Sequence, residues 1–227
     1  MLILAIDCAL DACATAVLDS DSDIVVASET RIMTRGHAEA LMPLIARVMD
    51  NAAVEFSGID RIAVTVGPGS FTGLRVGIAA ARGIALAAAK PAVGLTTLAG
   101  LAAPYIAQDD NAPVLAAIDA RHDHVYMQMF GPGGRTLVAP RIAPLREAVR
   151  AATRGPAHIV GSAAALVAAA WPDNEPPPAS VDPRGAPDIS WIARLGAAAA
   201  SGEDLPTPLY LRPPDAQPQA AARLPRR

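Results

Sequence analysis

Residues 59–89 read IDRIAVTVGPGSFTGLRVGIAAARGIALAAA, and this stretch decides the fold class. Its first part, Ile59 to Val66, is mostly apolar and β-branched, which is typical of a buried strand. Glycines then punctuate a turn from Gly67 to Gly73, and Leu74 to Ala89 is rich in helix-forming residues before Lys90-Pro91 stops the helix. A strand, a tight turn and a helix in this order predict an α/β fold.

Similar elements precede and follow this unit. Apolar residues at helical spacing predict a helix that begins near His37, with Pro43 in its first turns. Thr96 or Thr97 is placed to cap a helix that continues towards Tyr105. The strands predicted in this region are Leu2 to Asp7, Ala12 to Leu18, Asp23 to Thr30 and Ala92 to Leu95. The first lobe is therefore predicted to run βββαβαβα.

The second half of the chain repeats the first. Ala5-Ile6-Asp7 with Asp11 four residues later matches Ala117-Ile118-Asp119 with Asp123 four residues later. We expect lobes at 1–107 and 108–205, the second a truncated copy in βββαβα order, and an extended, partly disordered tail at 206–227. In the second lobe a strand at 114–119 is followed by an alternating strand and, after the turn at 131–134, by a third strand. Helices at 144–152 and 162–170 flank a strand at 157–160, and a loop at 171–187 precedes a last helix at 188–201.

Composition limits the function. Of the 227 residues, 52% are hydrophobic and 4% aromatic, and the net charge is −3. Such a chain folds, and its charge argues against a stand-alone nucleic-acid binder, so we expect RNA contact only together with a partner. Cys8 and Cys13 are too few for a disulfide framework and are expected to be buried free thiols. Met1 is followed by no basic leader or long apolar run, so we expect a cytoplasmic protein without membrane contact.

Two aspartates could carry chemistry. Asp7 and Asp119 end matching strands of the duplicated fold, where carboxylates can face a shared cleft and hold a hydrated metal ion or act on a proton. The alternative is that each tightens the turn after its strand, and without neighbouring acids this alternative is favoured.

The glycine turn also has two interpretations. Backbone NH groups near Gly67, Gly69 and Ser70 could cradle an anion at the start of the helix. The turn lacks the Lys-Ser/Thr ending of a Walker loop and the spacing of a dinucleotide fingerprint. A strand-to-helix turn capped by Ser70 or Thr72 is therefore favoured.

Small residues form two rows on the helix after this turn, one at Gly73, Gly77 and Ala81 and another at Ala80, Gly83 and Ala87. One row can pack on the sheet of its own lobe, so a second row, together with Met42 and Met49 on the preceding helix, predicts a surface for another protein. His37 has Leu41 four residues on instead of a second imidazole, so no metal site is predicted. Neither Ser70 nor Cys8 has a sequence context that specifies a catalytic base.

Five segments together resemble the TsaB family, formerly YeaZ. They are Ile3-Leu4-Ala5-Ile6-Asp7, His37-Ala38-Glu39 with Leu41-Met42-Pro43-Leu44-Ile45, the glycine segment from Gly67 to Gly77, Ala117-Ile118-Asp119-Ala120-Arg121, and Pro208-Leu209-Tyr210-Leu211-Arg212. The resemblance spans nearly the whole chain. It implies the duplicated ribonuclease-H-like fold shared by actin, sugar kinases and the catalytic subunit TsaD.

The resemblance also implies a role. It describes a non-catalytic subunit that dimerises with TsaD, which is joined by the ATPase TsaE and transfers a threonylcarbamoyl group to tRNA. ATP and metal then belong to the partner subunits, and tRNA is contacted only through the complex. The interface is expected on the helices at His37 to Asp50 and Leu74 to Ala89. Its candidate residues are His37, Leu41, Met42, Ile45, Met49, Arg75, Gly77, Ala80, Ala81 and Ile84.

Other assemblies and activities stay open at this point. The same helices could form a homodimer when the partner is absent. Asp7, Asp119 and the glycine turn would also suit an ATP-dependent phosphotransferase of the same superfamily. A peptidase is a third hypothesis, for which the sequence offers no nucleophile constellation.

Overall fold

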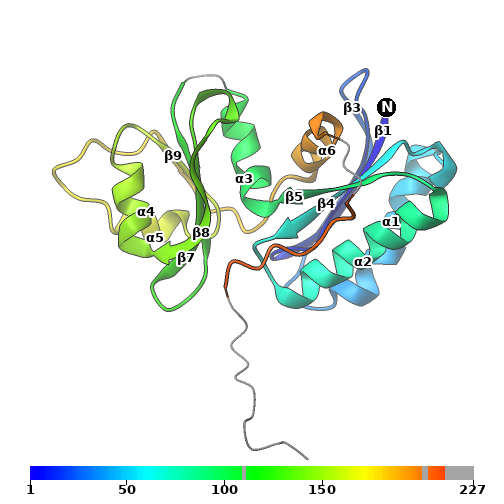
Figure 1. Ribbon diagram of the computed structural model, residues 1–227, viewed down its shortest axis with the longest axis horizontal. Coiled ribbons are helices and arrows are strands. Elements are labelled where there is room, and N and C mark those ends of the chain that lie inside the picture. Colours follow the sequence, from blue (N-terminus) through cyan, green and yellow to red (C-terminus); the bar gives the residue numbers. More distant parts are fainter. Residues whose placement is uncertain (109–110, 201–203, 213–227) are drawn as a thin grey trace, which may run out of the picture.

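A computed structural model describes residues 1–108, 111–200 and 204–212, which form two lobes built on five-stranded sheets (Figure 1). In the first half the elements are β1 (Leu2–Asp7), β2 (Ala12–Asp19), β3 (Ile24–Ile32), α1 (His37–Ala52), η1 (Phe56–Gly58), β4 (Arg61–Gly67), α2 (Phe71–Ala88), β5 (Ala92–Thr96) and α3 (Thr97–Ile106). In the second half they are β6 (Val114–Asp119), β7 (His124–Phe130), η2 (Pro132–Gly134), β8 (Thr136–Pro144), α4 (Leu145–Ala152), β9 (His158–Val160), α5 (Ala164–Ala169), β10 (Ser180–Asp182) and α6 (Ile189–Ala198).

The two sheets have the same topology. The first has the order β3-β2-β1-β4-β5, and the second, read from the other edge, has β8-β7-β6-β9-β10. In each sheet the first strand pairs antiparallel with the second and parallel with the fourth. This confirms the α/β class and the duplication predicted from the repeated Ala-Ile-Asp segments. The second copy is reduced, because β9 and β10 have three residues each and α5 has six.

The lobes exchange their last helices (Figure 1). Helix α6 follows the strands of the second lobe, yet its Ile189, Ile192 and Ala193 pack with Ile3 and Ala63 on the first sheet. Helix α3 follows the strands of the first lobe and packs its apolar side chains on the second sheet. The predicted boundary that assigned residues up to 205 to the second lobe is therefore corrected. Each sheet needs cover on both faces, and the exchanged helices supply the second cover.

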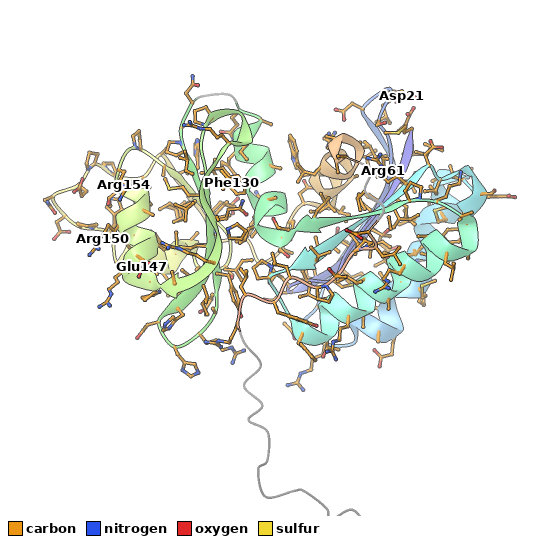
Figure 2. The ribbon with its side chains drawn as sticks, viewed as in Figure 1. Asp21, Arg61, Phe130, Glu147, Arg150 and Arg154 are labelled. Carbon is orange, nitrogen blue, oxygen red and sulfur yellow. The ribbon has the colours of Figure 1, made fainter. Side chains whose placement is uncertain are left out.

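Arg61 fixes α6 to the first lobe. Its guanidinium donates to the carbonyl oxygens of Gly196, Ala197 and Ala199 at 2.8, 3.2 and 2.7 Å. These are carbonyls that the last turn of a helix leaves without an intrahelical partner. Figure 2 shows Arg61 beside α6.

Two element predictions differ from the structure. The region 171–187 contains β10, which the sequence conceals because three residues on a sheet edge show no apolar periodicity. Helix α2 begins at Phe71 rather than Leu74, because the Ser70 side chain accepts a hydrogen bond from the Gly73 amide. The predicted cap at Ser70 is thus confirmed, as is that at Thr96, whose Oγ1 accepts from the Ala99 amide at 3.0 Å.

Helix α2 is 18 residues long and apolar enough to cross a membrane by length and composition alone. Its residues Leu74, Ile78 and Ala81 nevertheless pack into the core of the first lobe. The apolar composition of α2 therefore matches that of a core helix.

The chain end returns to the first lobe. Pro206 is buried, and the amide of Leu209 donates to the Val66 carbonyl at 2.7 Å. The extended ending predicted from Pro206 to Arg212 is thus found, and it lies alongside β4. The tail predicted to be partly disordered lies, from residue 213 on, outside the described residues.

Candidate partner-binding groove and interlobe cleft

Helix α1 turns most of its apolar side chains inward. Leu41, Ile45 and Met49 are buried in the core of the first lobe, and His37 is buried with its Nε2 3.2 Å from the Leu10 carbonyl oxygen. Because helical spacing shows that these residues share a face but not which neighbour covers it, the sequence placed them on the surface. The structure corrects this placement. Met42, with 49% of its area exposed, is the member of the predicted set that α1 presents to solvent.

The two rows of small residues on α2 face different neighbours. Gly73 and Gly77 approach Cys8 so closely that a methyl group on Gly73 would overlap the Cys8 carbonyl oxygen. Ala81 is fully buried in the same core. Thus Gly77 and Ala81, predicted as interface residues, serve packing within the lobe. The second row faces outward, and a methyl group on Gly83 would meet no atom within 4 Å.

This outward row lines an apolar groove. The groove has a volume of about 530 Å³ and is lined by side chains of α1, η1 and α2. They are Met42 of α1, Phe56 of η1, and Ala80, Gly83, Ile84 and Ala87 of α2. Ile84 forms part of the lining although it is 8% exposed, and Leu86 beside the groove is 85% exposed. Side chains of this kind, gathered on one face, are the usual mark of a protein-binding surface. In Figure 1, α1 and α2 lie side by side on the outer face of the first sheet.

Arg75 belongs to a separate cluster near the start of α2. Its guanidinium lies 3.6 Å from the Phe71 ring centroid and its Nε donates to the Tyr210 hydroxyl at 3.2 Å. Phe71 stacks on Tyr210 at 5.5 Å between ring centroids. Tyr210 of the returning chain end therefore holds the Arg75 side chain in place. The role of Arg75 in an interface stays a prediction.

A cleft of about 280 Å³ separates the lobes. Gly69, Ser70 and Asp119, three of the weak cofactor-binding candidates, line it together with Arg121 and Tyr126. Asp119 accepts a hydrogen bond from the Arg121 amide at 2.7 Å, which is the turn-tightening role expected for it. Gly67 lies elsewhere, packed against the backbone of Leu209 with φ of 116°.

The glycine turn packs on the turn after β1. The Ser70 amide donates to the Ala9 carbonyl at 2.7 Å, and a methyl group on Gly69 would overlap that same carbonyl. Glycine is therefore required here for backbone contact inside the lobe.

Cys8 and Cys13 are buried and free, with their sulfur atoms 3.4 Å apart. The hydrogen bond to Cys13, together with burial, raises the pKa of the Cys8 thiol, so it is not an activated nucleophile.

Asp7 does not reach the cleft. It is fully buried, and its Oδ1 accepts hydrogen bonds from the Thr65 hydroxyl at 2.5 Å and the Ala9 amide at 3.0 Å. Its Oδ2 has no hydrogen-bond partner among the described residues. The structure therefore does not bring Asp7 and Asp119 together as a carboxylate pair.

Burial raises the pKa of the Asp7 carboxyl, and the bonds from Thr65 and Ala9 oppose this shift without cancelling it. In the folded state Asp7 keeps its proton at pH values where the unfolded chain, with a pKa of about 3.9, has lost it. The contribution of Asp7 to the free energy of unfolding is therefore complete below a pH of about 3.9, and it decreases as the pH rises from there through the folded-state pKa of Asp7. The Asp7→Asn variant should lack this component. Thermal unfolding of both proteins between pH 4 and 8 checks it, and parallel profiles would contradict it.

One histidine forms a hydrogen bond with a serine that the sequence did not indicate. His122 and His124 lie at the β6–β7 turn, and no group of metal-ligating side chains is found in the described parts of the chain. Ser180 Oγ lies 2.7 Å from His158 Nδ1, since β9 and β10 place these residues side by side. The two are 22 residues apart, and β10 itself was not predicted. The pair lies on the edge strands of the second sheet, outside the lining of the interlobe cleft.

Known proteins resemble this chain along most of its length. The family model described as TsaD, tRNA N6-adenosine threonylcarbamoyltransferase, matches residues 25–171. The TsaB protein of Escherichia coli K12, named for tRNA threonylcarbamoyladenosine biosynthesis, is 37% identical over 126 residues, covering 56% of this chain and 53% of that protein. The alignment thus spans about half of the E. coli protein.

Two further relatives align over nearly their full length. An uncharacterised protein of Mycobacterium tuberculosis H37Rv is 32% identical over 225 residues, covering 96% of this chain and 95% of that protein. The solved structure of YeaZ from Pseudomonas aeruginosa superposes with a TM-score of 0.76 at 27% identity, covering 92% of this chain and 99% of that one.

Proposed function

Because this chain belongs to the TsaB/YeaZ family, we propose that it is a non-catalytic subunit that binds TsaD and supports threonylcarbamoyladenosine formation on tRNA. The catalytic step lies in TsaD, and TsaE joins the assembled complex. ATP and metal are held by these partners, and the complex works in the cytoplasm.

The groove between α1 and α2 is the observation that carries this proposal. An apolar space of about 530 Å³ beside a Leu86 that is 85% exposed offers a second helix pair a place to pack. The small residues Ala80, Gly83 and Ala87 let a partner helix approach closely. A relative of this fold carrying matching helices would complete a bundle, and a second copy of this chain would occupy the same groove when TsaD is absent.

The interlobe cleft supports the non-catalytic part of the proposal. The two aspartates needed by a phosphotransferase are separated, since Asp7 is sealed in the first lobe and Asp119 is exposed. The glycine turn contacts the turn after β1 through Gly69 and Gly73 instead of leaving a cradle open. A phosphotransferase therefore gains no specific support from these residues.

The test is the Gly83→Arg variant mixed with the cognate TsaD. Because a side chain at Gly83 meets nothing in its own chain, the arginine projects into the groove without disturbing the fold. We expect heterodimer affinity, measured by size exclusion and calorimetry, to fall at least about tenfold, or about 1.4 kcal/mol. Modification of tRNA by the reconstituted complex should fall with it.

Gly155→Arg is the matched control, because Gly155 also has open space around its α-carbon but lies in the second lobe. It should leave the heterodimer intact. Unchanged affinity of Gly83→Arg for TsaD, or a wild-type chain that forms no heterodimer, would contradict the proposal.

A further inference from the structure

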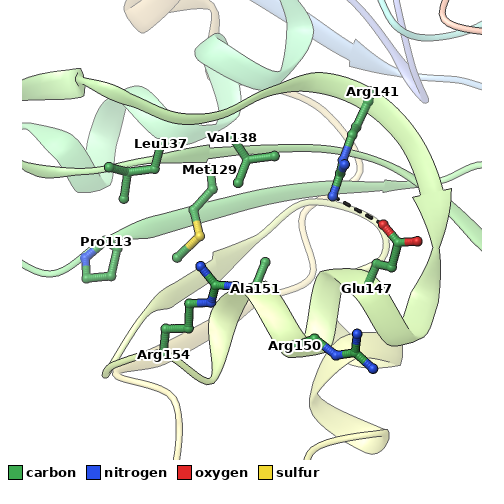
Figure 3. A pocket seen from close by; sticks show the side chains of 9 residues that line it. All are labelled: Pro113, Met129, Leu137, Val138, Arg141, Glu147, Arg150, Ala151 and Arg154. Atoms are coloured by element: carbon green, nitrogen blue, oxygen red, sulfur yellow. Dashed lines mark hydrogen bonds and ion pairs between the residues drawn. The ribbon is translucent and has the colours of Figure 1, made fainter.

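The second lobe carries a groove that the TsaD-binding proposal does not use. It lies between α4 and the β7–β8 hairpin and has a volume of about 540 Å³ (Figure 3). Its floor is apolar, formed by side chains such as Met129, Val138 and Ala151. Its rim is cationic, with Arg141, Arg150 and Arg154 around the opening. Figure 2 places Arg150 and Arg154 at the end of the second lobe that is remote from α1 and α2.

The charge around this groove is opposite to that of the whole chain. The segment from Arg135 to Arg154 holds five arginines and one acid, Glu147, so its formal net charge is +4. The complete chain has a net charge of −3, which leaves −7 for the remainder. A polyanion is therefore attracted to this end of the molecule and repelled from most of the remaining surface.

Two of the rim arginines are free to bind a ligand. Arg141 is paired with Glu147, with Nη2 and Oε2 3.2 Å apart, and Figure 3 shows this pair at one side of the opening. Arg150 and Arg154 are exposed, and their guanidinium groups have no hydrogen bond or ion pair within the described parts of the chain. Exposed arginines that a protein leaves unpaired beside a concave surface present complete bidentate donor sets to an anion.

The spacing of the arginines suits a regular polymer of phosphates. Arg146 and Arg150 lie four residues apart on α4, which places them on one face about 6 Å apart along the axis. Arg154 follows just beyond the end of α4, where it lines the groove together with Arg150. That separation is close to the distance between neighbouring phosphates in an RNA strand. Without aromatic side chains in its lining, the groove is suited to the RNA backbone rather than to stacked bases.

We propose that this arginine groove, formed by α4 and β8, binds the phosphate backbone of the tRNA that TsaD modifies. This inference rests on the proposed function for the identity of the RNA, but it concerns a different surface. A subunit that holds the partner through α1 and α2 and the substrate through α4 would contribute to tRNA binding directly. This direct contact goes beyond the expectation that the chain meets RNA only through its partner, and the titration described next decides between the two.

The test titrates fluorescent tRNA with the full-length chain at salt concentrations from about 50 to 200 mM. The Arg150→Glu/Arg154→Glu variant should bind tRNA at least about tenfold more weakly at the lowest salt. Each phosphate contact that is lost means that fewer counterions are released from the RNA on binding. The variant's slope of log affinity against log salt should be shallower by about 1.4 to 1.8. The control is Arg31→Glu/Arg35→Glu, which makes the same charge change at two exposed arginines of the first lobe and should keep the wild-type slope.

Other outcomes separate the alternatives. Unchanged tRNA binding by the Arg150→Glu/Arg154→Glu variant, or no binding by wild type at about 50 mM salt, would overturn the inference. The same follows if the variant loses affinity for a poly-glutamate peptide but not for tRNA, which would assign the groove to an acidic protein. The variant should still form the heterodimer with TsaD. Failure of wild type to form it would count against the proposed function, while the tRNA titration would still decide the role of the groove.

Discussion

Replacing Gly73 by alanine is expected to destabilise the protein by about 3 kcal/mol or more. The added methyl group would overlap the carbonyl oxygen of Cys8, which belongs to the backbone of the turn after β1 and cannot rotate away. Relief requires α2 to move from the sheet, which would loosen the contacts of Leu74 and Ile78 in the core. Urea denaturation followed by circular dichroism measures the loss.

Gly83→Ala is the matched control, because it makes the same chemical change ten residues later on the same helix. A methyl group at Gly83 meets no atom within 4 Å, so the reduced flexibility of the unfolded chain should dominate. We expect a gain of about 0.5–1 kcal/mol. Equal effects of the two substitutions would show that Gly73 is not required for close packing.

Arg61→Met is expected to cost about 3 kcal/mol. The arginine is buried beneath the end of α6 and donates to the carbonyls of Gly196, Ala197 and Ala199, which lose their charged donor in the variant. Because α6 covers one face of the first sheet, the loss should lower the unfolding midpoint in urea and weaken hydrogen-exchange protection in β1.

Arg194→Met provides the comparison on α6 itself. Arg194 pairs with Asp23, whose side chain is 67% exposed, so this ion pair is open to solvent. Such pairs contribute about 0–1 kcal/mol, and a small effect is expected. A loss at Arg61 no larger than that at Arg194 would contradict the anchoring role of Arg61.

Local signals in the sequence were sufficient for most elements. The buried strand before the glycine turn, the helical periodicity after His37 and the caps at Ser70 and Thr96 are all found in the structure. These features depend on neighbours within a few residues, which is the range over which patterns of side chains are informative. The repeated Ala-Ile-Asp segments identified the duplication because each copy begins with the same strand.

Long-range packing was less accessible. Nothing near α6 indicates that it packs on a sheet whose last strand ends at Thr96, and both exchanged helices are simply apolar. Likewise, periodicity gave the inward face of α1 but not its neighbour, so Leu41 and Ile45 were placed in an interface instead of a core. The two rows of small residues on α2 were easier to assign from the sequence, because one lobe can bury only one of two opposite helix faces.

The candidate sites show the same division. Asp7 and Asp119 end equivalent strands as predicted, but Asp7 is fully buried and bonded to Thr65 of the distant strand β4, which no local pattern indicates. The arginine groove did have a sequence signal, namely Arg146, Arg150 and Arg154 at intervals of four in an acidic protein. A net charge averaged over the chain conceals such a local excess.

The exchanged helices also constrain synthesis of the protein. The first sheet is complete once Thr96 has been made, but the helix that covers its other face ends at Ala198. At about 5–20 residues per second, a ribosome needs roughly 5–20 s to add the intervening hundred residues. During that interval the nascent chain exposes Ile3, Ala63 and Val93, which α6 later covers. These apolar side chains are therefore the surface that a chaperone would have to cover until α6 has been synthesised.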